Sequence, residues 1–546
     1  MRLKNSKHEK HHSIKGDAFF KFFPMKFYIC ALLAFCILGC GDAVTKKEYT
    51  SPDILFGELF VAVQTQQIFG DSKTFADAIP KFKAKEILLK YTQEKSKTAF
   101  NLAAFVNQNF TFPKSPDKVE NKKSLEKFLL EDWKNRTKKP LDDGGSLIPT
   151  RNNYLSAGNN SNELNYGSNY YSILGLLAAK QNILAKNIAV NAVQLIQDYG
   201  YMPVGNRTYL FGRSNPPFLA FILEEISKTN PEILKYALPQ LTQEYQFWMS
   251  AQNKEEGLKQ TEAQKKKELA FKRVVFLEKN NLLNRYYDPQ NTPRVETYFD
   301  DLELKKRNGN NNRFINKNLR AAAESDWENS SRWVSSSEKL EDVHPLQIAP
   351  VDLNALLYHL EKTLAKAYKA NEQPEYATSF ENLAKKRKAI FDTYFWDATK
   401  GFYFDYDFLK KKRSNVYALS GIFPLFVGLA SENQATKIAE LLEKSFLMPG
   451  GLATTLNVTG LLNDAPHGRA DLQWIAISGL RKYKKHVLAE QIKVRWIKTN
   501  TECYSKSGEL LEFYNVMNPE KNTEMKINKS AKIDKTSGIL YKLIKE

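Results

Sequence analysis

The sequence has few cysteines and none of the common motifs for metal or nucleotide chemistry. Of four cysteines in 546 residues, three (Cys30, Cys36 and Cys40) lie in the first 40 residues. Cys503 stands alone in the rest of the chain, which excludes a disulfide framework. The chain has no His-Glu-x-x-His or paired Cys-x-x-Cys spacing, no glycine-rich phosphate loop and no Gly-x-Ser-x-Gly motif. We therefore expect neither a metal site nor a nucleotide cofactor.

The composition is that of a globular protein with a large core. Hydrophobic residues make up 42% of the chain and aromatic residues 12%, with 25 Gly and 21 Pro, which excludes a disordered or collagen-like chain. The 80 Lys and Arg residues exceed the 61 Asp and Glu residues, which gives a net charge of +19. Because this excess is spread along the chain without a dense basic stripe, we predict a solvated basic surface and no nucleic-acid partner.

An apolar run near the N-terminus is too short to span a membrane. It extends from Phe27 to Leu38, whereas a spanning helix needs about 20 residues, so the run is typical of a secretory signal. It ends in Ile37-Leu38-Gly39-Cys40, which resembles the lipobox of bacterial lipoproteins and implies a lipid anchor at Cys40. The alternative is ordinary cleavage near Gly39 or Gly41. Either way, we expect an exported protein of the periplasm or cell envelope.

Helical periodicity dominates the chain beyond this signal. Apolar residues recur every three or four positions over residues 184–199 and 353–364. Strand-like alternation is confined to short stretches such as residues 402–404. We therefore predict a mainly α protein.

Three parts are predicted along the chain. Residues 1–39 form an N-terminal extension and signal peptide, and residues 40–60 form a lead-in. Residues 61–546 form one large domain. Within that domain, the lysine-rich segment 517–535 loses the apolar pattern of the flanking sequence.

Several loops at the ends of helical segments mix arginine, carboxylate, asparagine and tryptophan. Aromatic rings can stack on sugar faces, forked arginine donors bind hydroxyl groups, and paired carboxylates can cleave a glycosidic bond. This composition favours a sugar site. The loops are Gly205–Tyr209, Arg213–Pro217, Thr292–Glu296 and Glu324–Trp333.

At these loops the sequence resembles the trehalase family of inverting glycoside hydrolases. The resemblance extends from about Asp132 to Ile544, and its motifs occur in the order found in the family. It implies an (α/α)6 barrel that hydrolyses α,α-trehalose to two glucose molecules without a cofactor. The motifs are Ser146–Pro149, Gly205–Arg207, Arg213–Pro217, Ser330–Trp333, Pro350–Asn354 and Gly450–Asn457.

The resemblance assigns two carboxylates to catalysis. The family's general acid is an Asp between Gly-Trp and Ser-Ser-Arg-Trp, and Glu328 holds this position after Asp326-Trp327. The general base lies in a Glu-Lys-Tyr-Asn/Asp stretch, which the segment from Glu512 to Asn515 matches at three positions. The alternative for Glu328 is a solvated or arginine-paired carboxylate, and for Glu512 a solvated carboxylate at a helix end.

Substrate binding is implied for a further set of residues. Two of the family's three clamping arginines are retained, and polar residues stand beside them; the third arginine is missing. The expected substrate-binding residues are Arg213, Ser214, Asn215, Arg294, Glu296 and Asp326.

Other members of the loops have structural alternatives. Arg207 and Arg332 can pair with a nearby carboxylate or cap a helix. Trp327 and Trp333 are predicted to be core residues rather than sugar platforms.

Several positions depart from the family pattern. Asn160 takes an Arg position, Gly167-Ser168 take the place of Trp-Asp, Val204 replaces an Asn, and Arg469 replaces a Trp. These departures leave an alternative function, in which an impaired family member binds trehalose or a related glucoside without cleaving it. A third hypothesis is a lipoprotein scaffold with a vestigial site. We expect a monomer in each case.

Overall fold

The computed structural model describes residues 50–112, 123–158, 161–249, 269–309, 313–334, 339–524 and 533–546. These residues belong to one compact unit, Tyr49–Glu546. The predicted signal peptide, the lipobox and Cys40 lie outside the described residues. So do Asn160 and most of the lysine-rich segment after Glu524.

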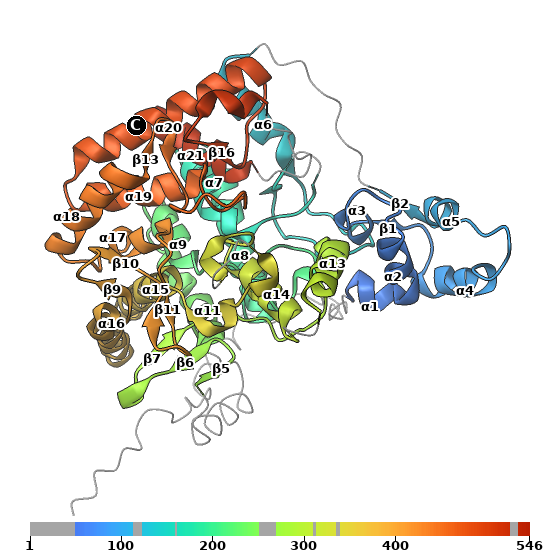
Figure 1. Ribbon diagram of the computed structural model, residues 1–546, viewed down its shortest axis with the longest axis horizontal. Helices are drawn as coiled ribbons and strands as arrows, with labels where there is room; N and C mark the ends of the chain where they lie inside the picture. The colour runs from blue at the N-terminus through green and yellow to red at the C-terminus, as the bar shows by residue number, and fades with distance from the viewer. Residues whose placement is uncertain are drawn as a thin grey trace, which may run out of the picture. The chain divides into compact units, whose positions relative to one another are not determined.

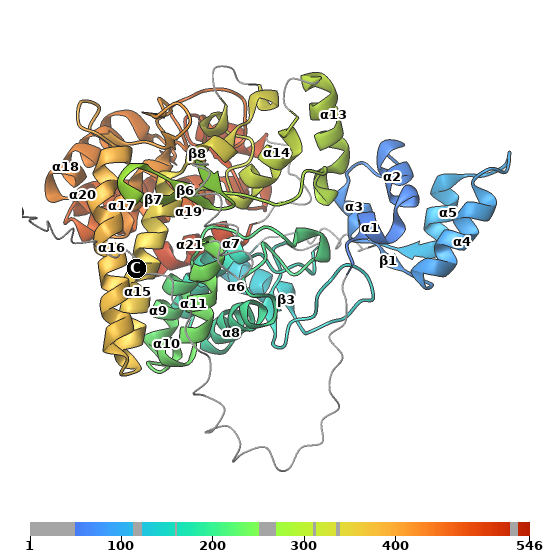
Figure 2. The same cartoon turned by 90° about the horizontal axis from the view of Figure 1, so that it is seen from below.

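Six helices of the described chain form a closed ring. In order of contact, α7 touches α9, α9 touches α15, and the series continues through α17, α19 and α21 back to α7. Figures 1 and 2 show the arrangement. The inner helices are α7 (Tyr166–Ala178), α9 (Leu219–Ser227), α15 (Val351–Ala370), α17 (Phe423–Phe426), α19 (Ala470–Lys482) and α21 (Asp534–Lys545).

Outer helices alternate with the inner ones along the sequence. The pair α15 and α16, for example, lies side by side in both views (Figures 1 and 2). This alternation of inner and outer helices is the (α/α)6 barrel, so the predicted fold class is confirmed. The outer helices are α6 (Leu125–Arg136), α8 (Asn182–Tyr199), α11 (Leu238–Trp248), α16 (Pro374–Phe395), α18 (Glu432–Leu441) and α20 (His486–Ser507).

Burial explains which helices are inner. Every residue of α7 from Tyr166 to Leu176 is buried, and its small residues allow close packing on both sides. In contrast, α16 buries mainly one stripe of its surface, with Ala377, Ala384 and Phe391 among the buried residues. A helix with one apolar stripe covers a core, whereas a helix that is buried all round lies within it.

The N-terminal part of the described chain packs as a smaller helical group. Phe56, Leu59 and Phe60 are buried there, and the same apolar cluster includes Tyr209 and Leu210 of the barrel loops. Residues 52–60, predicted as part of a lead-in, are therefore almost wholly helical. The helices are α1 (Pro52–Phe56), α2 (Glu58–Thr65), α3 (Lys73–Ala76), α4 (Ala84–Glu94) and α5 (Leu102–Asn109).

The remaining elements are short. Helices α10 (Ile233–Tyr236), α13 (Tyr298–Asn308) and α14 (Ile315–Glu324) lie between α9 and α15 in sequence. The strands form small antiparallel sheets, all of two or three strands. Their bounds are β1 Ile79–Pro80, β2 Phe110–Thr111, β3 Thr137–Lys138, β4 Tyr154–Leu155, β5 Ala270–Phe271, β6 Val274–Phe276, β7 Leu282–Asn284, β8 Ile348–Ala349, β9 Trp396–Asp397, β10 Phe402–Tyr403, β11 Tyr406–Asp407, β12 Lys412–Arg413, β13 Leu447–Met448, β14 Gly451–Leu452, β15 His467–Gly468 and β16 Tyr514–Asn515.

Candidate active site

The predicted site residues lie on loops that meet at the N-terminal ends of inner helices. Arg213 and Asn215 precede α9, and Arg469 immediately precedes α19. Glu328 lies on the loop after α14. Direct contacts join these loops, because Asn215 Oδ1 accepts a hydrogen bond from the Gly167 amide at the start of α7 (3.2 Å). The positive ends of helix dipoles favour carboxylates and hydroxyl oxygens at such a place.

Two arginines and two carboxylates of the predicted set are in contact. Arg213 donates from Nη2 to Glu296 Oε1 at 2.7 Å. Arg294 donates from Nη1 to Glu328 Oε2 at 2.6 Å, while its Nη2 and Nε hold Asp301 at 2.7 and 3.0 Å. The structure therefore brings together Arg213, Arg294, Glu296 and Glu328, and we call these four residues the arginine–carboxylate set.

The ionised form of Glu296, a carboxyl of this set, is strongly favoured. Burial opposes the charged form of this carboxyl, but Arg213 and Arg294 outweigh the effect and lower its pKa to about 2. The side chain of Glu328 is 48% exposed, whereas that of Glu296 is only 18% exposed. Glu328 is thus the carboxylate of the set that is open to solvent.

Two polar atoms of the set are buried and lack a hydrogen-bond partner within the described chain. They are Arg213 Nε, which lies 3.6 Å from Asp288 Oδ2, and Glu296 Oε2. A free donor and a free acceptor are costly to bury. A hydroxyl group supplies both complements, because it can accept from one and donate to the other.

Asp326 belongs to a second group of charges. Its carboxylate accepts from Arg469 Nη2 at 2.7 Å and pairs with Lys535. Arg469 and Lys535 both also pair with Asp471, the second residue of α19. We call Asp326, Arg469, Asp471 and Lys535 the charge cluster. Asp326 has a left-handed backbone (φ 62°), at the position where the family pattern has Gly.

Glu512 lies close to Arg469. It is half-buried and precedes β16, which pairs with β15 next to Arg469. Burial opposes the charge of Arg469, but Asp471, Asp326 and Glu512 together raise its pKa. Asn463 continues the connection, since it accepts from Arg469 Nη1 and donates to the Glu328 carbonyl, both at 2.6 Å. Arg469 therefore links the loops of both predicted catalytic carboxylates.

Ser214 and Asn215 make mainly structural contacts. Both are almost fully buried. The Ser214 amide donates to Glu324 at 3.0 Å and its hydroxyl donates to the Asn215 carbonyl at 3.0 Å. These contacts hold the loop that carries Arg213.

Arg332 and the two tryptophans of the Glu324–Trp333 loop are structural. Arg332 pairs with Asp352 at 2.8 Å and with Asp405 at 2.7 Å, and all three side chains are nearly inaccessible. Trp327 and Trp333 are buried, and Trp333 Nε1 donates to the Trp327 carbonyl at 2.9 Å. The prediction that these tryptophans are core residues is confirmed.

The other loop arginine pairs in the same way. Arg207 lies 3.3 Å from Asp77. Carboxylate pairing was one of the two alternatives considered for Arg207 and Arg332, and both side chains adopt it.

The structure adds a lysine that the sequence analysis missed. Lys73 of α3 donates to Glu163 at 2.7 Å and to Tyr209 Oη at 2.6 Å, and lies 3.0 Å from Asp77. Burial works against its charge, yet Asp77 and Glu163 raise its pKa. Nothing in the local sequence of Lys73 marks it, because its partners come from distant loops. Asp471 and Lys535 were missed for the same reason.

Two cavities of the described part of the chain lie away from the predicted site residues. Cavities of about 380 and 220 Å³ are lined by residues outside the predicted site. No group of three or more His, Cys, Asp or Glu side chains among the described residues could hold a metal ion. Nor does any described helix have the length and apolarity to cross a bilayer.

The ends of the inner helices in this (α/α)6 barrel present carboxylates and arginines, the groups with which glycoside hydrolases cleave and bind a sugar. A family model described as trehalase matches residues 67–534. Periplasmic trehalase of Salmonella agona (strain SL483) is 37% identical over 471 residues, covering 85% of this chain and 81% of that protein. Periplasmic trehalase of Shigella flexneri is 35% identical over 493 residues, covering 89% and 86%. The chain belongs to the trehalase family, as its motifs predicted.

A solved structure supports the fold independently. Neutral trehalase from Saccharomyces cerevisiae superposes with a TM-score of 0.56 at 23% identity, covering 71% of this chain and 73% of that one. The family match starts at residue 67, whereas the sequence motifs began near Asp132. The relationship therefore includes α3, α4 and α5.

Proposed function

We propose that this chain hydrolyses α,α-trehalose to two glucose molecules with inversion, using Glu328 as general acid and Glu512 as general base. The pairing of Glu328 with Arg294 also fits the arginine-paired alternative, so the observation that carries the proposal is the solvent-open carboxyl of Glu328, 48% exposed, beside a set that also holds Arg213 and Glu296. Family membership supports the reaction, because curated relatives are named periplasmic trehalases. No cofactor is required.

The reaction needs one proton donor and one proton acceptor. Glu328 gives its proton to the glycosidic oxygen as the bond from that oxygen to the anomeric carbon breaks. Glu512 takes a proton from a water molecule, whose oxygen bonds to the same carbon from the opposite face. Both products are then glucose. Glu328 ends as the ionised carboxylate, and Glu512 ends as the protonated acid.

Binding of the sugar hydroxyls falls to the remaining residues. Arg213 and Arg294 supply guanidinium donors, and Glu296 supplies a carboxylate acceptor. When substrate enters, Arg294 can exchange its bond to Glu328 for one to a hydroxyl group. In this scheme Asp326 completes the binding set, while Ser214 and Asn215, which are buried, act by positioning the loop that carries Arg213.

A glucose-release assay on trehalose tests the assignment. Glu328→Gln and Glu512→Gln should each lower kcat by at least about a hundredfold, because general acid or base catalysis contributes factors of roughly 10² to 10⁴. Glu440→Gln is the matched control, since Glu440 is an exposed carboxylate of α18. Variants that keep the wild-type rate would remove the two carboxylates from the mechanism.

A second candidate function is sugar binding without cleavage. The charge cluster favours it, because Arg469 occupies the position of a family tryptophan and is fixed by Asp326 and Asp471. Calorimetry that detects trehalose binding while turnover stays absent would select this function. Turnover of about 1 to 1,000 per second would dismiss it. The scaffold hypothesis requires that both binding and turnover be absent.

We also propose export to the periplasm or cell envelope, with a lipid anchor at Cys40 and a monomeric protein. Support comes from the Leu38-Gly39-Cys40 motif and from relatives that are named periplasmic. Labelling of growing cells with a radioactive fatty acid tests the anchor, since a Cys40→Ala variant should lose the label.

A further inference from the structure

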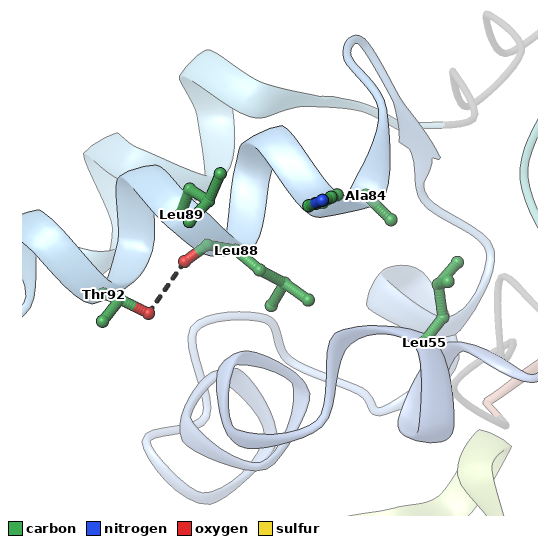
Figure 3. Close-up of a pocket in the computed structure, with 6 residues that line it drawn as sticks. Leu55, Ala84, Leu88, Leu89 and Thr92 are labelled. Carbon is green, nitrogen blue, oxygen red and sulfur yellow. Dashed lines mark hydrogen bonds between the residues drawn. The ribbon is translucent and has the colours of Figure 1, made fainter.

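An apolar groove lies between two N-terminal helices, far in sequence from the barrel loops. It measures about 380 Å³, and Figure 3 shows Leu55 of α1 and Leu88 of α4 on either side of it. Ala84 and Leu89 complete its apolar lining, while Lys85 and Thr92 supply its polar side chains.

Large apolar side chains stand exposed on the same two helices and just before α4. Ile54 is 71% exposed, Leu89 is 55% exposed and Phe82 is 44% exposed. Leu55, which lines the groove, is 37% exposed. Leu55 and Leu89 both line the groove, while Ile54 adjoins Leu55 in the chain and Phe82 lies two residues before Ala84. Single exposed apolar residues are ordinary, but a group of them marks an interaction surface. We call Ile54, Leu55, Phe82 and Leu89 the apolar face.

Lysines outnumber carboxylates in the segment that carries α4, and one of them, Lys95, pairs with Glu58 of α2. Residues 81–97 contain six lysines and only two glutamates. Lys85 lines the groove, and Lys90 Nζ lies 4.0 Å from the centre of the Phe82 ring. Apolar side chains among lysines are typical of helices that lie on an anionic bilayer. The apolar side chains enter the boundary of the acyl chains, and the lysines attract the anionic headgroups.

The position of the face in the chain indicates which partner it meets. The described chain begins at Thr50, immediately before α1, and Cys40 precedes Thr50 by ten residues. Ten residues span at most about 36 Å when fully extended. A lipid anchor at Cys40 would therefore hold α1 and α4 close to the membrane, at a high effective concentration.

We infer that the apolar face and its lysines lie flat on the anionic bilayer that receives Cys40. The short-tether argument rests on the proposed anchor, whereas the surface itself does not. Once the chain is anchored, this contact would set the orientation of the barrel relative to the membrane.

Vesicle co-sedimentation tests the surface without the anchor. We would use unacylated residues 41–546, which include the whole compact unit Tyr49–Glu546, with phosphatidylcholine vesicles that contain or lack phosphatidylglycerol. The protein should bind the anionic vesicles. The double variant Ile54→Ser/Leu89→Ser should bind at least about tenfold more weakly. Lys85→Gln should weaken binding roughly fivefold.

Matched controls separate this face from general charge effects. Ile183→Ser/Val487→Ser changes two residues that are 80% and 75% exposed on α8 and α20, and it should bind as the wild type does. Equal binding by Ile54→Ser/Leu89→Ser and wild type would overturn the inference. A change in oligomeric state instead of vesicle binding would also overturn it, because the face would then join two copies. Trehalose turnover is measured in parallel, so that failure of the proposed function is seen separately.

Discussion

Glu296 lies between two guanidinium groups, and this position makes its charge a source of stability. The pKa of its carboxyl is about 2, well below the ordinary value of 4.5, because Arg213 and Arg294 favour the ionised form more than burial opposes it. A lowered pKa stabilises the fold above the unfolded pKa, and this stability is lost as the pH falls through the folded pKa. The window therefore extends from about pH 4.5 down to pH 2.

We predict that Glu296→Gln lowers the free energy of unfolding by about 3 kcal/mol at pH 7, the value of a shift of roughly 2.5 pKa units. About half of the difference should remain near pH 3. Urea unfolding of wild type and variant across this range measures it, with the exposed Glu440→Gln as the control that changes neither curve. A difference that stays constant with pH would contradict the ion-pair explanation.

The residues of the site differ in how far sequence alone could predict them. Arg213, Arg294 and Glu296 were predicted because each lies in a short motif, and the structure brings all three together. Lys73 and Lys535 were not found, because a lysine acquires its meaning here only from carboxylates on distant loops. The sequence around Lys535 showed only a lysine-rich segment without an apolar pattern.

At the scale of elements, Tyr166 ties three helices together. It is the first residue of α7, its hydroxyl donates to Glu244 of α11, and it accepts from the amides of Phe218 and Leu219 at 3.1 and 2.9 Å. These amides belong to the start of α9, where backbone donors lack partners within the helix. Burial raises the pKa of Glu244 to about 8, and the hydrogen bond from the Tyr166 hydroxyl partly offsets this effect.

We expect Tyr166→Phe to lower the free energy of unfolding by about 2 to 4 kcal/mol, because three buried polar groups lose a partner. Hydrogen exchange should become faster at the Phe218 and Leu219 amides, a local effect that a general loss of packing would not produce. Tyr236→Phe, which removes a hydroxyl from a residue that is 73% exposed, is the control. Unchanged exchange at both amides would show that the hydroxyl does not cap α9.

Helix periodicity predicted elements better than it predicted their places in the fold. The apolar pattern over residues 184–199 corresponds to α8, and that over residues 353–364 lies within α15. The same pattern could not show that α15 belongs to the inner ring and α8 to the outer one. That distinction depends on burial around the whole circumference of a helix, which distant partners determine.

For the whole molecule, the decisive step is closure of the ring by its first and last inner helices. These helices, α7 and α21, approach so closely that a glycine of each helix faces the backbone of the other helix. A Cβ on Gly175 would lie 2.6 Å from the Gly538 carbonyl oxygen, and one on Gly538 would lie 2.3 Å from that of Tyr171. Both contacts are far shorter than real Cβ atoms permit. Only the structure gives the physical reason for glycine at both positions.

Gly538→Ala should therefore separate α21 from α7 and lower the free energy of unfolding by about 3 kcal/mol, since backbone atoms cannot move aside as a flexible side chain would. Gly70→Ala is the matched control, because no atom lies within 4 Å of its Cβ position, and its effect should stay within about 0.5 kcal/mol. Urea unfolding measures both variants. Lys535 lies in the first turn of α21 and pairs with Asp326. Displacement of this helix should therefore also loosen the charge cluster. We expect a folded Gly538→Ala variant to bind sugar more weakly than the wild type. Equal stability of the two variants would show that the ring closes without this close approach.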